Sequence, residues 1–184
     1  MNYATLASGL KITKKGINIL DVGTGSGCIA LALKKNLPEA KVTAVDNSAK
    51  ALKVAKHNAK VQKLDVKFLK ADILNLKGSK SSPFSIIVSN PPYIPPSEKE
   101  FMQENVLLYE PKEALFVPEE NPLLFYKAIS HFALKNNGPV ILYFEINETK
   151  AHDLSAMLIN MGLKNIVIKK DINGRERMIK CSSQ

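Results

Sequence analysis

The sequence contains few of the residues that disulfide-linked or metal-binding proteins need. Its 184 residues include only two cysteines and three histidines. Cys28 and Cys181 lie far apart, one in a predicted buried helix and one at the C-terminal tail, so we expect two thiols and no disulfide. Since no Cys/His group has metal-ligand spacing, we expect no metal site. The histidines stand singly in helical patterns, at His57, His131 and His152.

Long apolar segments are also missing. No run approaches the ~20 residues that span a bilayer, and the apolar stretch at 6–12 is too short for a signal peptide and is interrupted by charge and turn residues. We find no repeat, low-complexity tract or interdomain linker. With 45% hydrophobic residues, the chain is large enough to bury a core. We therefore expect a single cytosolic (cytoplasmic) domain that is a monomer and does not contact membranes.

Acidic residues are outnumbered, which gives a formal net charge of +9. The lysines in the segment 50–63 recur at i,i+3 and i,i+4 spacing without interleaved aromatic residues, which is typical of a solvated helix face. Attraction to RNA or to an acidic protein partner stays open. These lysines are Lys50, Lys53, Lys56, Lys60 and Lys63.

The most informative segment is a proline-rich tetrapeptide that follows a predicted buried strand at 84–89. Its residues are Asn90, Pro91, Pro92 and Tyr93. In open α/β sheets, ligands bind at this end of a strand. The Asn90 side chain and the Pro91 carbonyl offer acceptors, and the prolines bring no N–H donors. The loop therefore suits a planar –NH2 group with Tyr93 as a pocket wall; a proline turn with Tyr93 in the core is the alternative.

A glycine turn joins an earlier strand, at 17–21, to a helix at 28–35. Glycine permits close approach of a ligand to the backbone, and the helix start offers unpaired N–H groups. The GxGxG spacing differs from a dinucleotide fingerprint, because Cys28 stands where the third glycine belongs. Asp21 favours a ligand with a cationic end, while a tight connection without a ligand is the alternative. The turn comprises Gly23, Thr24, Gly25, Ser26 and Gly27.

Two further acids follow predicted strands. Asp46 ends the strand at 41–46, and Ser48 is placed to cap the helix at 49–60. An acid at this point of a βαβ unit binds ribose hydroxyls in related folds, although a capping role alone is equally consistent. Asp72 follows the strand-like segment 66–70, where it could hydrogen-bond an adenine amine with Ile73 packed on the ring.

Together these segments resemble the class I methyltransferases that use S-adenosyl-L-methionine. More closely, the segments 89–95, 109–111, 114–116 and 174–177 are similar to the protein N5-glutamine methyltransferases of the HemK family. Members of that family methylate the glutamine of the GGQ motif in peptide-chain release factors. The resemblance covers about Ile17 to Lys180, nearly the whole chain.

The resemblance implies a fold, a cofactor and a partner. The fold is a Rossmann-like α/β domain, with a seven-stranded, mostly parallel sheet that ends in an antiparallel hairpin. The cofactor is S-adenosyl-L-methionine and the partner a release factor. The resemblance implies catalytic roles for Asn90, Pro91 and Tyr93, and substrate contacts for these three residues and Pro92. Cofactor contacts are implied for Asp21, Gly23, Thr24, Gly25, Ser26, Gly27, Asp46, Asp72, Ile73 and Asn90.

The N-terminal part departs from the family pattern. We expect residues 1–16 to be a short lead without the helical substrate domain and acidic linker usual in the family, and residues 17–184 to form the methyltransferase domain. Either a catalytic domain excised from a longer protein or a short relative of the family fits this pattern. We therefore expect cofactor binding together with a raised KM for the release factor.

The remaining patterns alternate between helix and strand. Helices are expected at 123–135 and 150–161, a strand at 140–146, and a hairpin from strands at 165–169 and 177–180. The connection at 95–111 is longer than ordinary loops and is predicted to be a lid on the substrate side.

Three other functions stay open. The same tetrapeptide serves nucleic-acid methyltransferases, so the substrate could be a base amine of RNA or DNA. A non-catalytic binding module is a second possibility, and the intact Asn90 and glycine turn argue against it. A nucleotide-dependent oxidoreductase is disfavoured by the GxGxG spacing.

Overall fold

The computed structural model describes residues 16–76, 83–101 and 111–184. The N-terminal lead therefore lies almost wholly outside the described residues, as do most of the loop expected at 78–83 and much of the predicted lid. The domain division expected at residue 16 stays a prediction.

Seven strands and five α-helices are described, with two short 3-10 helices. The predicted element boundaries agree with the observed ones to within two residues, as is usual for helix and strand ends. In chain order the elements are β1 (Asn18–Val22), α2 (Cys28–Asn36), β2 (Lys41–Asp46), α3 (Ala49–Gln62), β3 (Lys67–Lys70), β4 (Ile86–Ser89), η1 (Pro96–Phe101), α5 (Lys112–Leu115), α6 (Leu124–Leu134), β5 (Ile141–Glu145), η2 (Glu148–Lys150), α7 (Ala151–Asn160), β6 (Lys164–Lys170) and β7 (Glu176–Ser182).

The strands form one sheet with the order β3-β2-β1-β4-β5-β7-β6. Neighbouring strands from β3 to β5 are parallel, whereas β7 runs antiparallel to both β5 and β6. This arrangement confirms the predicted class I methyltransferase fold and its terminal antiparallel hairpin.

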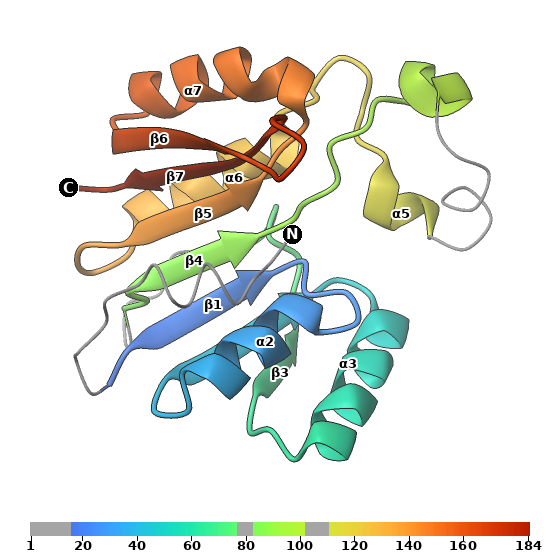
Figure 1. The fold of residues 1–184 in the computed structure, drawn as a ribbon, viewed down its shortest axis with the longest axis vertical. Helices are drawn as coiled ribbons and strands as arrows, with labels where there is room; N and C mark the ends of the chain where they lie inside the picture. Colours follow the sequence, from blue (N-terminus) through green and yellow to red (C-terminus); the bar gives the residue numbers. More distant parts are fainter. Residues whose placement is uncertain (1–15, 77–82, 102–110) are drawn as a thin grey trace.

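Two hydrophobic clusters occupy opposite faces of the sheet. Successive side chains of a strand point to opposite faces, so Ile19 joins one cluster and Leu20 the other. The Ile19 cluster includes Ile29 and Leu33 of α2, and the Leu20 cluster includes Tyr126 of α6. Helices α2 and α3 accordingly lie over the β1–β3 half, whereas α6 and α7 lie over the β5–β7 half (Figure 1).

The strand order reverses between β1 and β4, which makes their shared carboxyl edge the topological switch point of the sheet. In Figure 1 both arrows point toward this edge, and η1 and α5 stand beyond the end of β4. The register pairs Val22 with Ser89, so the glycine turn and the proline-rich loop leave the sheet from adjacent strands at the same level.

The cysteines differ from expectation in their surroundings. Both are free thiols, but Cys28, at the first position of α2, is exposed, whereas Cys181 lies buried inside β7 and not in a tail. Burial raises the pKa of the Cys181 thiol to about 12. Among the described helices, none has the length and apolar character needed to cross a membrane.

Candidate active site

The glycine turn is suspended from the neighbouring strand. The backbone N–H groups of Gly23 and Thr24 both donate to the Val45 carbonyl, at 2.9 and 3.0 Å. Farther along the turn, the Ser26 carbonyl accepts from the Asn58 side chain of α3 at 3.0 Å. These bonds fix the turn between β2 and α3, so its shape does not depend on a ligand.

All three glycines of the turn have positive φ, and they serve two purposes. A Cβ added at Gly27 (φ 86°) would lie 3.1 Å from Cβ of Ala55, so this glycine permits close packing of α2 on α3. A Cβ at Gly23 or Gly25 would meet nothing within 4 Å. The backbone of these two residues therefore borders open space, which a ligand can approach closely.

Asp21 lies inside the turn and has no exposed surface. Its Oδ2 accepts from Thr24 Oγ1 at 2.6 Å and from the Ala30 N–H at 3.1 Å. Burial raises the pKa of this carboxyl to about 6, against the lowering effect of the two hydrogen bonds. The carboxyl is more enclosed than the sequence suggested, and its direct contact with a cationic ligand stays a prediction.

Asp46 joins the turn to the start of α3. Its Oδ2 accepts from the Gly25 N–H and its Oδ1 from the Ser48 N–H, both at 2.8 Å. Ser48 caps the helix as predicted, because its Oγ accepts from the Ala51 N–H at 3.2 Å. The carboxylate is thus oriented beside the open face of Gly25, and each oxygen retains a lone pair for a further donor.

Asp72 and Ile73 are placed differently from one another. Asp72 is half-buried and closes its own turn, accepting from the Leu74 N–H at 3.0 Å and from Asn75 Nδ2 at 2.7 Å. Ile73 is 9% exposed and packs in the core with Val45. Only a small part of its side chain is left for a ring, so its predicted adenine contact stays untested.

Asn90 begins the loop at the other side of the switch point. Ser89 Oγ donates to the Val22 carbonyl at 2.7 Å, which joins the end of β4 to the end of β1. The Asn90 side chain is exposed and makes no hydrogen bond to any residue in the described ranges. Pro91 is buried and anchors the loop, so a fixed backbone presents an unengaged amide.

The residues after the tetrapeptide are fixed by a distant segment. Ile94 forms a parallel bridge with Phe116: its N–H donates to the Leu115 carbonyl at 3.1 Å, and its carbonyl accepts from Val117 at 3.0 Å. The segment 114–116, singled out in the sequence for its resemblance, therefore borders the proline-rich loop. Tyr109 and Glu110 lie outside the described residues.

The site thus combines a preformed turn with an open face, an oriented carboxylate, and a free amide across the switch point. A family model described as "Methyltransferase small domain" matches residues 4–117. The chain belongs to this methyltransferase family. Family membership identifies the switch point as the edge at which to look for cofactor and acceptor sites.

Relatives in sequence confirm the predicted resemblance. The chain is 48% identical over 175 residues to the release factor glutamine methyltransferase of Flavobacterium psychrophilum, covering 93% of this chain and 60% of that protein. It is 43% identical over 164 residues to the enzyme of the same name from Bacteroides thetaiotaomicron, covering 88% and 58%. The chain therefore spans about 60% of the length of the curated relatives that it matches.

A solved structure supports the fold. The ribosomal protein L11 methylase of Lactobacillus delbrueckii subsp. bulgaricus superposes with a TM-score of 0.61 at 20% identity, covering 98% of this chain and 75% of that chain.

Two charged residues near the loop were not predicted. Glu145 ends β5 and Arg177 lies on β7. Burial is the main cause that raises the pKa of Tyr93, the Glu145 charge raises this pKa further, and the Arg177 charge lowers it. An acid at the end of a strand was the signal that singled out Asp46, and it applies equally to Glu145. Arg177 lies in the segment 174–177, which the resemblance singled out without a role, and β7 joins β5 through antiparallel pairing.

Proposed function

We propose that this domain transfers a methyl group from S-adenosyl-L-methionine to the side-chain amide nitrogen of a glutamine, in the GGQ motif of a peptide-chain release factor. The observation that carries the proposal is the exposed, unengaged Asn90 amide on a loop fixed beside the glycine turn. The names of the similar proteins from F. psychrophilum and B. thetaiotaomicron support this substrate.

The residues present fit the cofactor. Gly23 and Gly25 border open space in which an added Cβ would meet nothing, as expected where a ligand lies against backbone. Asp46 is oriented beside that space and would hold the ribose hydroxyls. Asp72 would lie at the adenine end. Bound there, S-adenosyl-L-methionine supplies a sulfonium methyl group as the electrophile.

Positioning is the main task of the acceptor loop. An amide nitrogen is a weak nucleophile because its lone pair is delocalised into the carbonyl. The Asn90 side-chain oxygen and the Pro91 carbonyl would each accept one N–H of the substrate amide, which leaves the face of the nitrogen open. Holding reactants in line contributes up to about 7–11 kcal/mol in favourable cases. The same acceptors stabilise the positive charge that develops on nitrogen.

No general base is needed before methyl transfer, because the acidic proton can leave afterwards to solvent. The protonation state of Tyr93 is consistent with a reaction that uses no general base. Burial is the main cause that raises the pKa of its phenol above the ordinary value, so at neutral pH the hydroxyl stays protonated and does not accept a proton. Its role is that of a neutral wall of the acceptor pocket.

The proposal is tested by presenting substrates side by side. Isotope-labelled S-adenosyl-L-methionine is incubated with the domain and either a release factor, the same factor with its GGQ glutamine replaced by asparagine, or RNA. Label should enter the intact factor alone, at the glutamine located by mass spectrometry. Label in RNA but not in the factor would refute the proposal in favour of a nucleic-acid methyltransferase. Because the chain spans only part of its relatives' length, the factor is used at a saturating concentration.

A further inference from the structure

Helix η1 continues from the acceptor loop and stands beyond the carboxyl end of β4 (Figure 1). The loop before it has its own anchors, which are the buried Pro91 and the bridge from Ile94 to Phe116. Since η1 lies past the last of these anchors, it needs contacts of its own to hold its place. Such contacts act on η1 without being needed to fix Asn90.

Glu119 holds the first turn of η1. Both oxygens of its carboxylate accept from Ser97: Oε2 from the N–H at 3.1 Å, and Oε1 from the hydroxyl at 2.5 Å. The bond from the hydroxyl, followed by the bond from the N–H, is the main cause that lowers the pKa of the Glu119 carboxyl. The acceptor is therefore ionised at neutral pH, and bonds to an ionised acceptor are stronger than bonds between neutral groups.

The backbone that carries Glu119 is fixed on both sides. Val117 is buried, and its N–H donates to the Ile94 carbonyl at 3.0 Å. The Asn121 N–H donates to the Pro118 carbonyl at 3.0 Å, which closes the turn that contains Glu119. The carboxylate therefore holds η1 from a rigid support.

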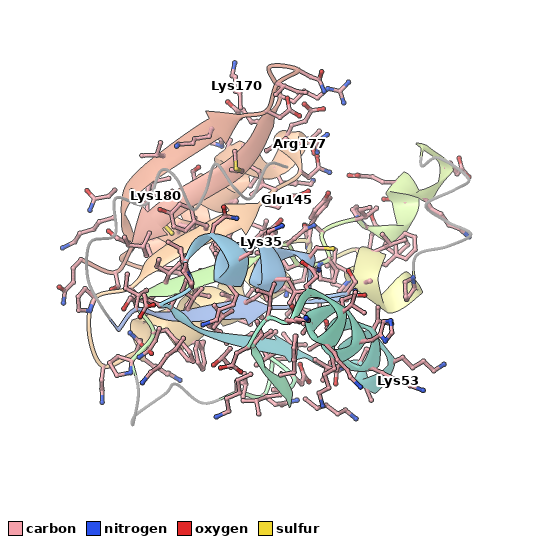
Figure 2. All side chains as sticks on the ribbon, turned by 60° about the horizontal axis from the view of Figure 1, so that its bottom comes forward. Lys35, Lys53, Glu145, Lys170, Arg177 and Lys180 are labelled. Carbon is pink, nitrogen blue, oxygen red and sulfur yellow. The ribbon has the colours of Figure 1, made fainter. Side chains whose placement is uncertain are left out.

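A second contact joins η1 to the end of β5. Asn147 lies two residues beyond Glu145, the last residue of β5, which is labelled in Figure 2. Its Nδ2 donates to Glu98 Oε2 at 3.4 Å, and its Oδ1 accepts from the Thr149 N–H at 3.1 Å, which caps η2. The long bond to Glu98 is weaker than the two bonds to Ser97.

We propose that Glu119 and Asn147 are positioning residues that hold η1 as a fixed wall beside the acceptor loop, along which the polypeptide around the target glutamine lies. We call their contacts with Ser97 and Glu98 the η1 clamp. Because Asn90 is anchored separately, loss of the clamp impairs docking of the release factor and spares the methyl-transfer step. This inference rests on the proposed function.

The chain offers two controls for the Glu119 contact. Glu120 is exposed and makes no hydrogen bond or ion pair within the described ranges. Glu119→Ala and Glu120→Ala thus remove the same charge from neighbouring positions, and only the first breaks the clamp. Glu119→Gln removes the charge but keeps the contact, because its amide can accept from the Ser97 N–H and donate to the Ser97 hydroxyl.

The first experiment measures steady-state methylation of the release factor. Glu119→Ala should raise KM for the factor by about 5-fold, with kcat and S-adenosylhomocysteine affinity within about 2-fold of the wild type. Glu120→Ala and Glu119→Gln should match the wild type. A KM unchanged by Glu119→Ala, an equal rise in Glu120→Ala, or a loss confined to kcat would overturn the inference.

The contact between Glu98 and Asn147 is tested by reversing it. Asn147→Asp keeps the acceptor that caps η2, but it replaces the donor with a carboxylate oxygen that repels Glu98, so KM should rise by about 5-fold. Adding Glu98→Gln restores the bond with donor and acceptor exchanged, and KM should return to within about 2-fold of the wild type. A KM that the second substitution does not restore would remove Asn147 from the clamp.

A measurement without substrate separates this inference from the proposed function. Hydrogen exchange at the Ser97 amide, followed by nuclear magnetic resonance, should be about 5-fold faster in Glu119→Ala and unchanged in Glu119→Gln and Glu120→Ala. Faster exchange together with no methylation by the wild type would support the clamp and refute only the proposed function. Exchange unchanged by Glu119→Ala would overturn the inference.

Discussion

The two halves of the candidate site are held by different kinds of contact. In the cofactor half, the glycine turn donates hydrogen bonds to Asp21, to Asp46 and to the Val45 carbonyl. All of these residues lie within the first βαβ unit. In the acceptor half, the loop at Asn90 is fixed by β1, by the segment 115–117 and by packing on β5 and α6. The cofactor half is therefore a local structure and the acceptor half a junction of distant segments.

The halves also differ in the availability of their polar groups. Both oxygens of Asp46 already accept backbone hydrogen bonds, which orient the carboxylate before any ligand arrives. The Asn90 amide has no partner within the described part of the chain. In the proposed function, the cofactor would therefore bind to a preorganised set of groups, whereas the Asn90 amide would be engaged by the substrate.

The largest effect on the cofactor half is expected from Asp46→Ala. Two charge-assisted hydrogen bonds to the ribose would be lost, each worth about 1.5–3 kcal/mol, so the affinity for S-adenosylhomocysteine should fall by more than about 100-fold. Asp46→Asn keeps one carbonyl acceptor, so its affinity for S-adenosylhomocysteine should lie between those of the wild type and Asp46→Ala. Calorimetric titration measures this, with the exposed Asp65→Ala as control. An affinity unchanged by Asp46→Ala would remove Asp46 from the cofactor site.

The burial of Asp21 makes the cofactor half sensitive to pH. The carboxyl pKa is raised from 3.8 to about 6 in the folded chain, so the folded state binds the proton more tightly than the unfolded state. Its stabilising contribution is complete below pH ~4 and is lost as pH rises through about 6, a change of about 3 kcal/mol.

Asp21→Asn cannot ionise and should remove that component of the pH dependence. The free energy of unfolding in urea, measured between pH 4 and 7, should fall by about 2 kcal/mol more in the wild type than in this variant. The exposed Asp65→Asn should keep the wild-type dependence. Parallel curves for wild type and Asp21→Asn would mean that the Asp21 carboxyl titrates alike in the folded and unfolded chains.

A smaller effect separates the two purposes of the glycines. Both Gly23→Ala and Gly27→Ala introduce a side chain at positive φ, at a cost of about 1–2 kcal/mol. Gly27→Ala should cost about 1 kcal/mol more, because its Cβ meets Ala55. Only Gly23→Ala should weaken S-adenosylhomocysteine binding beyond its effect on stability. Equal stability losses would show that the α2–α3 contact adjusts freely.

The division into local and distant contacts also explains what the sequence predicts. The Ser48 cap, the strand ending at Asp46 and the glycine turn follow from neighbouring residues, and the structure agrees. The buried run before Asn90 was sufficient to place it at the carboxyl edge of the sheet. These features depend on periodicity and short-range hydrogen bonds.

Features that depend on pairing between distant segments were not predicted. The bridge from Ile94 to Phe116 and the hydrogen bond from the Ile146 N–H to the Arg177 carbonyl join residues that no local pattern relates. The burial of Cys181 was misjudged for a similar reason, because β7 lies between β5 and β6 and encloses its thiol. Such contacts require the sheet order, which the sequence implied only through resemblance.

The central claim is that the two halves do separate work, and Asn90→Ala tests it most directly. Loss of one preorganised group that strengthens its interaction in the transition state typically lowers the rate by about 10²–10³-fold. We predict such a fall in kcat for methylation of a release factor, with S-adenosylhomocysteine affinity within about 2-fold of the wild type. Near-normal kcat in Asn90→Ala would contradict the role assigned to the proline-rich loop.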